Sequence, residues 1–277
     1  MSSLGDEPLS EINFTGGFPE NKDFAPSIVF LIAYVLITPL FLYRIFRRQD
    51  RTLILIRPGI FLGCRYAMLI IRAILAKGHY SLGLLIAELV LVSIGFLFLI
   101  EPLISLWERH VKDSLGDNRP SWVVRLGRLL KIVLIVTIAI SAASGALVNQ
   151  AFKSADGVQK VKTLRETGYI LSLVVVGLAI FAIVYTHLHF SLRTQQTGFL
   201  LIPACCLLIV AVYRVVQTYQ TDPDAASRST AAFYILQVLF EFIAFIALIS
   251  ISLPTWYPDY KTSSKEKNGY PLQTSQV

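Results

Sequence analysis

Seven apolar segments constrain the fold of this chain of 277 residues more than any other feature of its sequence. A helix of about 20 residues crosses the apolar layer of a bilayer, which is about 30 Å thick. Within lipid, only helices and closed barrels satisfy every backbone group, and these segments are continuously apolar rather than alternating. The sequence therefore predicts an all-α integral membrane bundle of seven transmembrane helices.

Composition supports this class. The chain is 55% hydrophobic and 16% charged, whereas soluble domains have about 45–50% apolar and about 25% charged residues. The formal net charge of +7 comes from basic residues that flank the apolar segments instead of forming a domain of their own. Such residues are typical topology signals, so nucleic acid is not an expected partner.

The helices divide the chain into one membrane domain and two tails. We expect residues 1–23 to be a disordered exterior tail, residues 24–254 to form the seven-transmembrane domain, and residues 255–277 to be a disordered cytosolic tail. The expected helices cover residues 25–46, 53–75, 81–106, 129–148, 168–190, 199–219 and 230–253.

Basic residues favour an N-terminus outside the cytosol and a C-terminus within it. Arginines crowd the first connection, and arginines and lysines crowd the third, which places most basic residues on the cytosolic side. The connection at 150–167 disagrees, because it would be exterior and yet contains Lys153, Lys160, Lys162 and Arg165. Trp107, Trp122 and Trp256 are expected at the cytosolic interface, where aromatic rings are enriched.

Several ionisable residues lie inside the apolar segments. Each costs about 2.5–3.5 kcal/mol near the bilayer centre, so it needs a partner or a wet cavity. At 1.5 Å per residue, Arg65 and Glu241 both lie roughly 15 Å below the exterior surface. The same rise places Arg72, Glu88 and Arg214 nearer that surface, at roughly 5–10 Å. We therefore expect Arg65 to pair with Glu241, with Arg214 as the second candidate partner.

Two polar stripes can face one interior. Arg65 and Arg72 are seven residues apart and share nearly one helix face. Tyr234, Gln237 and Glu241 follow helical spacing on another helix. The predicted ligand-binding residues are Arg65, Arg72, Glu88, Arg214, Gln237 and Glu241.

A second pair is expected near the cytosolic ends of two helices, between Arg57 and Glu101. On an ideal helix Glu88 and Glu101 point in different directions, and a kink at Pro102 would ease this conflict. Two interpretations of the buried charges stay open. They are either clamps between helices or a polar pocket, open to the exterior leaflet, for an anionic or zwitterionic group.

Other signals are weaker. Asn13 begins a glycosylation sequon, which requires an exterior N-terminus. The small residues at 141–145 favour close helix packing. Cysteine and histidine show no metal-ligand spacing, and nucleophile elbows, Walker loops and dinucleotide loops are absent from the sequence. We therefore expect neither an enzyme nor a metal or cofactor.

Two short elements resemble those of rhodopsin-like G-protein-coupled receptors. Glu108-Arg109-His110 ends one helix, and Pro254-Thr255-Trp256-Tyr257 follows the last helix on the same side. This resemblance implies a receptor-like signalling protein, in which the buried charges lock helices together. A cytosolic signalling partner would then bind near the first element.

A further resemblance concerns three segments: residues 87–95, Tyr213-Arg214 after Pro203, and residues 239–242 around Glu241. Together with the arginines of 53–75, they resemble an uncharacterised fungal seven-transmembrane family, known as a domain of unknown function. Ala25-Pro26-Ser27 and the residues at 213–216 are also similar to the RTA-like lipid-translocating exporter family. These resemblances imply a fungal source, and the second implies lipid transport.

Together, these observations predict a multi-pass protein of the fungal plasma membrane or an endomembrane. It would bind or translocate a lipid-like or amphipathic small molecule, with membrane lipids as partners. Arg65, Arg72 and Arg214 would hold the anionic group, and Glu88 and Glu241 would orient those arginines. The alternative is the receptor-like protein.

Overall fold

A computed structural model describes residues 14–47, 53–151, 154–220, 222, 225–250 and 256. Asn13 and most of the predicted C-terminal tail therefore lie outside the described residues. Throughout the described part, all regular structure is helical, and seven helical segments are long and apolar enough to cross a membrane. The predicted all-α fold with seven transmembrane helices is confirmed.

The seven spans are built from continuous helices and from helices in series. The spans are η1 (Asn21–Asp23) with α2 (Phe24–Phe46); α3 (Ile56–Ala76), preceded by η2 (Leu53–Leu55); α4 (Leu82–Gly95) with α5 (Leu97–Leu115); α6 (Ser121–Ala146) with α7 (Val148–Ala151); α8 (Ala155–Phe190); α9 (Thr194–Tyr219); and α10 (Thr230–Ala232) with η5 (Phe233–Leu239) and α11 (Phe240–Ser250). Two further short helices, η3 (Gly116–Asn118) and η4 (Ala226–Arg228), lie in connections.

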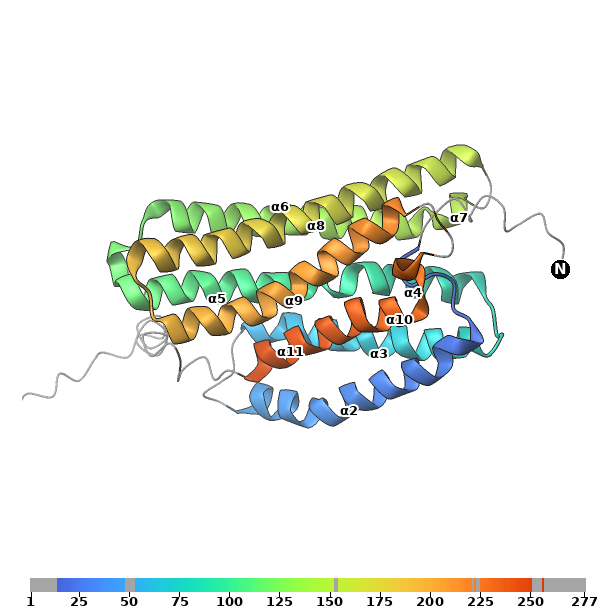
Figure 1. Cartoon of the computed structure of the whole chain (residues 1–277), viewed down its shortest axis with the longest axis horizontal. Coiled ribbons are helices and arrows are strands. Elements are labelled where there is room, and N and C mark those ends of the chain that lie inside the picture. Colours follow the sequence, from blue (N-terminus) through green and yellow to red (C-terminus); the bar gives the residue numbers. More distant parts are fainter. Residues whose placement is uncertain are drawn as a thin grey trace, which may run out of the picture.

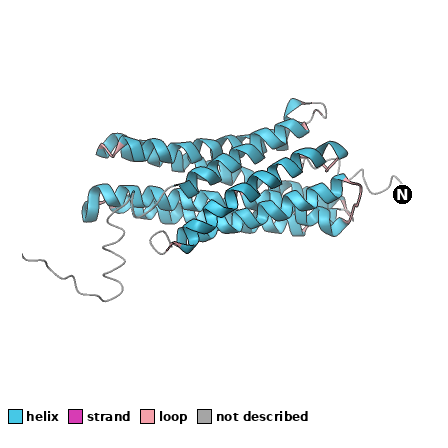
Figure 2. Cartoon of the chain, turned by 90° about the horizontal axis from the view of Figure 1, so that it is seen from below, coloured by secondary structure: helices cyan, strands magenta, loops and turns pink. Residues whose placement is uncertain are grey.

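Successive spans run in opposite directions, so the described chain enters at one end of the bundle and α11 finishes at the other (Figure 1). We call the first the N-terminal end and the second the opposite end. Helices α2 and α3 pack together on one side, α6 and α8 on the other, and α9 contacts α8, α5 and α11. Turned by 90°, the bundle again shows only helices along its length (Figure 2).

Large apolar side chains cover the outside of the bundle. On α2, Val29, Ile32 and Leu36 are exposed, and Phe181 and Leu188 are exposed on α8. In water such a surface would be an aggregation hazard, but in lipid it is the expected outer face. The chain is therefore a multi-pass integral membrane protein.

The third span is broken near its middle. Helix α4 ends at Gly95 and α5 begins at Leu97, whereas the sequence predicted one helix over 81–106. Pro102, where a kink was expected, lies inside α5, six residues after Phe96. The break lies at Gly95, against which the guanidinium of Arg65 packs closely, so the tertiary contact and the helix end coincide.

Helix α8 begins at Ala155, well before the predicted start at 168, and is 36 residues long. Its first turns are amphipathic, since Val158, Val161 and Arg165 are buried while the polar residues between them face outward. The mean hydropathy of such an amphipathic segment is low, so a hydropathy window does not identify it as part of a membrane helix. Arg165, which the sequence placed in a basic exterior loop, is buried inside the bundle with 4% of its surface exposed.

Two further expectations have different outcomes. Trp107 is not an interfacial ring, because it is 1% exposed and its indole nitrogen donates a hydrogen bond to Thr186. The small residues at 141–145 do pack closely, since a Cβ added to Gly145 would lie 2.1 Å from a methyl of Val90 in α4. The predicted packing role of this stripe is confirmed.

Residues 14–23 lie within the predicted disordered tail, but they pack against the N-terminal end of the bundle. Phe14, Thr15 and Asp23 are at most 2% exposed. Gly16 has a φ of +87°, and an added Cβ would lie 2.8 Å from the ring of Phe233. Only glycine combines this backbone conformation with so close an approach. We call residues 14–23 the N-terminal cover.

Candidate functional site

The buried charges form three adjoining clusters in the half of the bundle nearer the N-terminal end. We define the Glu241 cluster as Arg65, Arg214 and Glu241, the Arg72 cluster as Gly16, Asp23, Arg72 and Glu88, and the Tyr169 cluster as Thr15, Ser93, Arg165, Tyr169 and Arg214. Arg214 belongs to two of them and connects them. The predicted charges thus lie together in the structure.

Glu241 binds both predicted partners. Its Oε2 lies 2.7 Å from Arg65 Nη2, and its Oε1 lies 3.4 Å from Arg214 Nη2. All three side chains are 0% exposed. The predicted pairing of Arg65 with Glu241 is confirmed, and the second candidate, Arg214, shares the same carboxylate. One carboxylate therefore joins α3, α9 and α11.

The broken third span supplies the remaining acceptors of these arginines. Arg214 donates hydrogen bonds of 2.9 and 2.6 Å to the backbone carbonyls of Ser93 and Val92, and Arg65 donates one of 3.2 Å to that of Leu91. The last carbonyls of a helix have no partners within it and carry a partial negative charge. Because α4 ends at Gly95, the carbonyls of Val92 and Ser93 are among its last four and lie inside the bundle, where Arg214 binds them.

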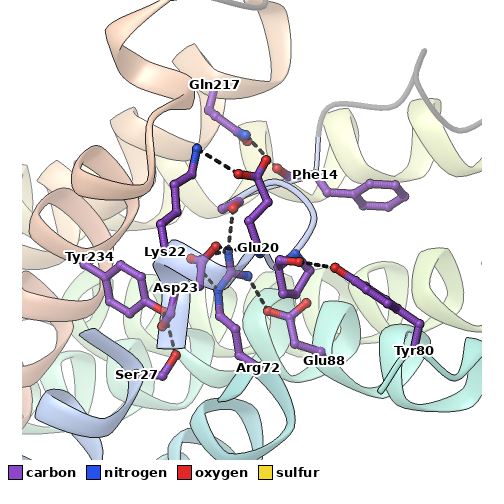
Figure 3. Close-up of polar contacts among 12 residues, drawn as sticks. Phe14, Glu20, Lys22, Asp23, Ser27, Arg72, Tyr80, Glu88, Gln217 and Tyr234 are labelled. Carbon is purple, nitrogen blue, oxygen red and sulfur yellow. Dashed lines mark hydrogen bonds and ion pairs between the residues drawn. The ribbon is translucent and has the colours of Figure 1, made fainter. Parts of the chain in front are cut away.

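The Arg72 cluster joins the N-terminal cover to α3 and α4 (Figure 3). Arg72 Nη1 lies 2.7 Å from Glu88 Oε1, and Arg72 Nη2 and Nε lie 3.0 and 3.1 Å from Asp23 Oδ1. Arg72 also donates a hydrogen bond to the carbonyl of Gly16, and its guanidinium lies 4.5 Å from the ring centre of Phe233. Two carboxylates, a carbonyl and a ring thus surround this guanidinium.

Residues of α9, of η5 and of the connection between α3 and α4 hold the cover in place. Gln217 in α9 donates a hydrogen bond of 2.6 Å to the carbonyl of Phe14, and Tyr80 donates one to the carbonyl of Pro19 (Figure 3). Tyr234 donates one to the carbonyl of Asp23 and also bonds Ser27. Where the sequence predicted a pocket open to the exterior, the chain's own N-terminal segment covers the buried charges.

The Tyr169 cluster contains the arginine that the sequence assigned to a loop. Arg165 Nη2 donates a hydrogen bond of 2.7 Å to the Tyr169 hydroxyl, which is also 3.1 Å from the hydroxyl of Thr15. The guanidinium of Arg214 lies 5.6 Å from the Tyr169 ring centre. Phe14 covers Arg165 from outside, with its ring centre 4.7 Å from the guanidinium.

Arginines outnumber carboxylates in the three clusters. Arg65, Arg72, Arg165 and Arg214 are buried together with only Asp23, Glu88 and Glu241. Among the described residues, no carboxylate forms an ion pair with Arg165. Its contacts are the Tyr169 hydroxyl and the rings of Phe14 and Tyr169, and Glu88 is near enough for electrostatic attraction without an ion pair. The arginines exceed the carboxylates by one over the three clusters, and Arg165 is the arginine without an ion pair to a carboxylate of the described residues.

The other predicted site residues are also placed. Gln237 lies in the π-helix η5 and is 0% exposed, and its side-chain oxygen and nitrogen have no hydrogen-bond partner in the described chain. Arg57 and Glu101 form the expected second pair, at 3.9 Å. Glu88 pairs with Arg72 and Glu101 with Arg57, so the two acids face α3 from opposite sides of the break between α4 and α5.

Asp23, Arg165 and Tyr169 were not predicted from the sequence. The spacing of Val158, Val161 and Arg165 continues to Tyr169 on one helix face, and this amphipathic pattern is a signal that could have revealed Arg165. Asp23 precedes the first apolar segment, and no local pattern marks it as a partner of Arg72.

The opposite end of the bundle contains the receptor-like element. Glu108 pairs with Lys131 of α6, and His110 is buried with its Nε2 2.9 Å from the Thr197 hydroxyl of α9. Trp256 packs on Phe199, while Pro254, Thr255 and Tyr257 lie outside the described residues. This end is held by contacts between α5, α6 and α9.

No group of three histidine, cysteine or acidic side chains within the described ranges could hold a metal ion. Comparison with family models, with curated proteins and with solved structures finds no match. The fold and the site therefore define the class: a seven-helix integral membrane protein with a buried, arginine-rich ionic network beneath an N-terminal cover. The resemblances to two fungal families stay predictions.

Proposed function

We propose that this protein binds an amphipathic anion at the Tyr169 cluster and moves it across the membrane. The observation that carries this proposal is Arg165, a buried guanidinium with no carboxylate partner in the described chain, in a network where arginines outnumber acids. A buried charge without an ion-pair partner is costly, and an anionic ligand would supply one. The apolar part of the ligand would lie in the surrounding lipid or between helices.

Unpartnered polar atoms in the network support this proposal. The Nε atoms of Arg165 and Arg214, the Gln237 amide and the hydroxyl of Tyr213 have no hydrogen-bond partner in the described chain. Leaving a buried donor unpaired costs about 1–3 kcal/mol. A phosphate or carboxylate group supplies several acceptors at once, so one ligand would satisfy more than one of these donors.

The cover provides a mechanism for entry. In the cover, the carbonyl of Phe14 accepts a hydrogen bond from Gln217, and the carbonyl of Gly16 accepts one from Arg72. Carbonyl oxygens there occupy the positions that a ligand's anionic oxygens would take. In the proposed cycle the ligand displaces residues 14–16, and the cover closes again after the ligand leaves.

Two irregular spans support movement rather than simple binding. Transporter sites commonly lie between discontinuous helices whose ends bind charged groups. Here α4 ends at Gly95 beside Arg65, and the π-helix η5 ends two residues before Glu241. π-Helices are rare and frequent at functional sites. A change at either irregularity would alter how the arginines bind Glu241 and so the affinity for the anion.

The test uses the full-length protein in phosphatidylcholine vesicles that contain a fluorescent anionic lipid analogue. Arg165→Gln should abolish protein-dependent movement of the anionic analogue while the protein stays folded. The matched control is Lys162→Gln, since Lys162 is basic, on the same helix and exposed. A zwitterionic analogue should move more slowly than the anionic one.

Three results would overturn the proposal. The first is that the unaltered protein neither moves the analogue nor gains thermal stability from a short-chain alkyl phosphate. The second is that Lys162→Gln has the same effect as Arg165→Gln, which would indicate a general surface charge. The third is equal movement of the anionic and zwitterionic analogues.

A receptor-like role is the second candidate, because the cover binds the buried network through its own residues, as a ligand covalently attached to the protein would. In this proposal, release of the cover weakens the Glu241 cluster and loosens the contacts at the opposite end. Phe14→Ala should then increase copurification of a cytosolic signalling partner, whereas Lys22→Ala, at an exposed ion pair of the same segment, should not. No change with Phe14→Ala would reject this candidate.

A further inference from the structure

A crevice between α2 and α3 lies on the outside of the bundle, at the N-terminal end. Its volume is about 310 Å³. Ile28 and Leu31 of α2 and Ile70 and Ile74 of α3 form its apolar walls. Ile70 and Ile74 are 45% and 39% exposed, so the crevice is open to the lipid that surrounds the bundle.

Basic side chains form the rim of this crevice. Lys77 and His79 follow the end of α3, where headgroups meet the apolar layer. The Lys77 ammonium lies 4.0 Å from the ring centre of Phe24, which holds it over the mouth of the crevice. No carboxylate of the described residues forms an ion pair with Lys77, so its charge is available to a ligand.

We propose that this crevice is a specific site for an anionic phospholipid. An acyl chain lies between α2 and α3, and the phosphate meets Lys77 and His79. Apolar walls alone would accept any lipid, but the cationic rim without a nearby acid favours a net negative headgroup. An exposed pair between a lysine and an anionic group contributes about 0.2–1 kcal/mol, which corresponds to at most about fivefold in affinity.

The position of the crevice couples it to the buried network. Phe24 directly follows Asp23, and Ala73, which also lines the crevice, directly follows Arg72. A lipid in the crevice therefore packs on the backbone that holds the Asp23–Arg72 ion pair. The site does not depend on the function proposed above, since it lies outside the bundle and does not involve Arg165.

Photo-crosslinking tests this proposal on the full-length protein in phosphatidylcholine nanodiscs. A small fraction of phosphatidic acid or phosphatidylcholine carries a photoreactive group on its acyl chain, and crosslinked peptides are identified by mass spectrometry. Phosphatidic acid should label the peptides of α2 and α3 that line the crevice more strongly than phosphatidylcholine does. Lys77→Gln should reduce this labelling, by at most about fivefold, and Lys162→Gln should not change it.

A variant that fills the crevice provides an independent check. Ile74→Trp should remove the labelling with Lys77 intact, whereas Ile60→Trp, at an exposed position elsewhere on α3, should leave it unchanged. Both positions are outward-facing, so folding should be preserved. Equal labelling by the two lipids, unaffected by Lys77→Gln, would show ordinary boundary lipid only and overturn the proposal.

Two further outcomes identify the source of the phosphate and separate this proposal from the previous one. Competition by inorganic phosphate would indicate a site for a soluble anion and would also overturn the proposal. Arg165→Gln should leave crevice labelling intact even if it abolishes lipid movement. Loss of labelling in Arg165→Gln would show that the crevice is not a separate site.

Discussion

Glu241 and Arg65 form an ion pair of 2.7 Å between two side chains with no exposed surface, and the same carboxylate also binds Arg214. One acid thus binds two guanidiniums and neutralises the charge of one. The remaining acceptors of those arginines are backbone carbonyls in the last turn of α4, which ends inside the bundle because the third span is broken. The stability of the bundle and the position of its positive charge both depend on this arrangement.

The Glu241 cluster should behave as a coupled unit. Glu241→Leu leaves two buried arginines without their carboxylate and should lower stability by about 3–5 kcal/mol. Arg65→Met should cost less, because Arg214 still binds Glu241. The double variant should be more stable than Glu241→Leu alone, since only Arg214 remains charged and it keeps the carbonyls of Val92 and Ser93.

Thermal unfolding of detergent-solubilised protein, followed by size-exclusion chromatography, measures these differences. The control pair is Arg57 and Glu101, which are 3.9 Å apart and partly exposed, and whose replacement should change stability by about 1 kcal/mol or less. If Glu241→Leu is no worse than Glu101→Leu, the carboxylate does not hold the helices together.

Gly95 should not tolerate even one added methyl group. A Cβ there would lie 2.9 Å from the guanidinium of Arg65, which is fixed by Glu241 and the Leu91 carbonyl. We expect Gly95→Ala to destabilise the protein by about 1–3 kcal/mol, as overpacked cores are. Gly63→Ala in α3 is the matched control, because nothing lies within 4 Å of its added Cβ. It should be neutral or stabilise by up to about 1 kcal/mol.

Unfolding midpoints of both variants check this prediction. Equal midpoints for Gly95→Ala and the unaltered protein would show that Arg65 can move away from α4 at little cost. The geometry of the Glu241 cluster would then be less constrained than the structure indicates.

Asp23 should control the opening of the N-terminal cover. Asp23→Asn removes one of the two carboxylates that bind Arg72 and leaves Glu88 as its only ion-pair partner. Hydrogen bonds to charged groups contribute about 1.5–3 kcal/mol, so the cover should open about tenfold more often or more. The buried Thr15, replaced by cysteine in a background without Cys64, Cys205 and Cys206, reports opening through its labelling rate by a membrane-impermeant maleimide.

The control for this experiment is Lys22→Gln, which removes an exposed charge from the same segment. It should leave the labelling rate unchanged. An unchanged rate in Asp23→Asn as well would mean that Gln217, Tyr80 and Tyr234 hold the cover without help from the Arg72 cluster.

The two ends of the chain should lie on opposite sides of the membrane, because the described residues contain seven spans, an odd number. Basic residues predict that the N-terminus is outside the cytosol. Compartment-specific reporters fused to each end measure this directly, and modification at Asn13 would agree with an exterior N-terminus. Both reporters on one side would contradict the seven-span topology, and a cytosolic N-terminus would contradict the predicted orientation.

The thickness of the hydrocarbon layer made it possible to predict from the sequence both the spans and the pairing of Arg65 with Glu241. Hydrocarbon thickness relates position along an apolar helix to depth, so Arg65 and Glu241 can be matched in depth without knowing which helices touch. Burial cost then requires each charge to find a partner at its own depth. Pairing of Arg57 with Glu101 follows from the same argument.

Arg165 shows where this reasoning fails. The first turns of α8 are polar on the outside and apolar only on one face, so an average along the chain does not separate them from a loop. The hydrogen bonds of Arg214 to the carbonyls of Val92 and Ser93 could not be predicted from the sequence either. Every residue has a backbone carbonyl, so the sequence does not mark which carbonyls accept them.

Sequence by itself determined the number of spans, the class of protein and the depth at which charges must meet, since these depend on local apolar length and on the cost of desolvating a charge. Only the tertiary structure decided that α4 ends at Gly95 against Arg65, that Asp23 closes over Arg72, and that Arg165 enters the network. Those features depend on which distant segments lie side by side, and packing in three dimensions sets this.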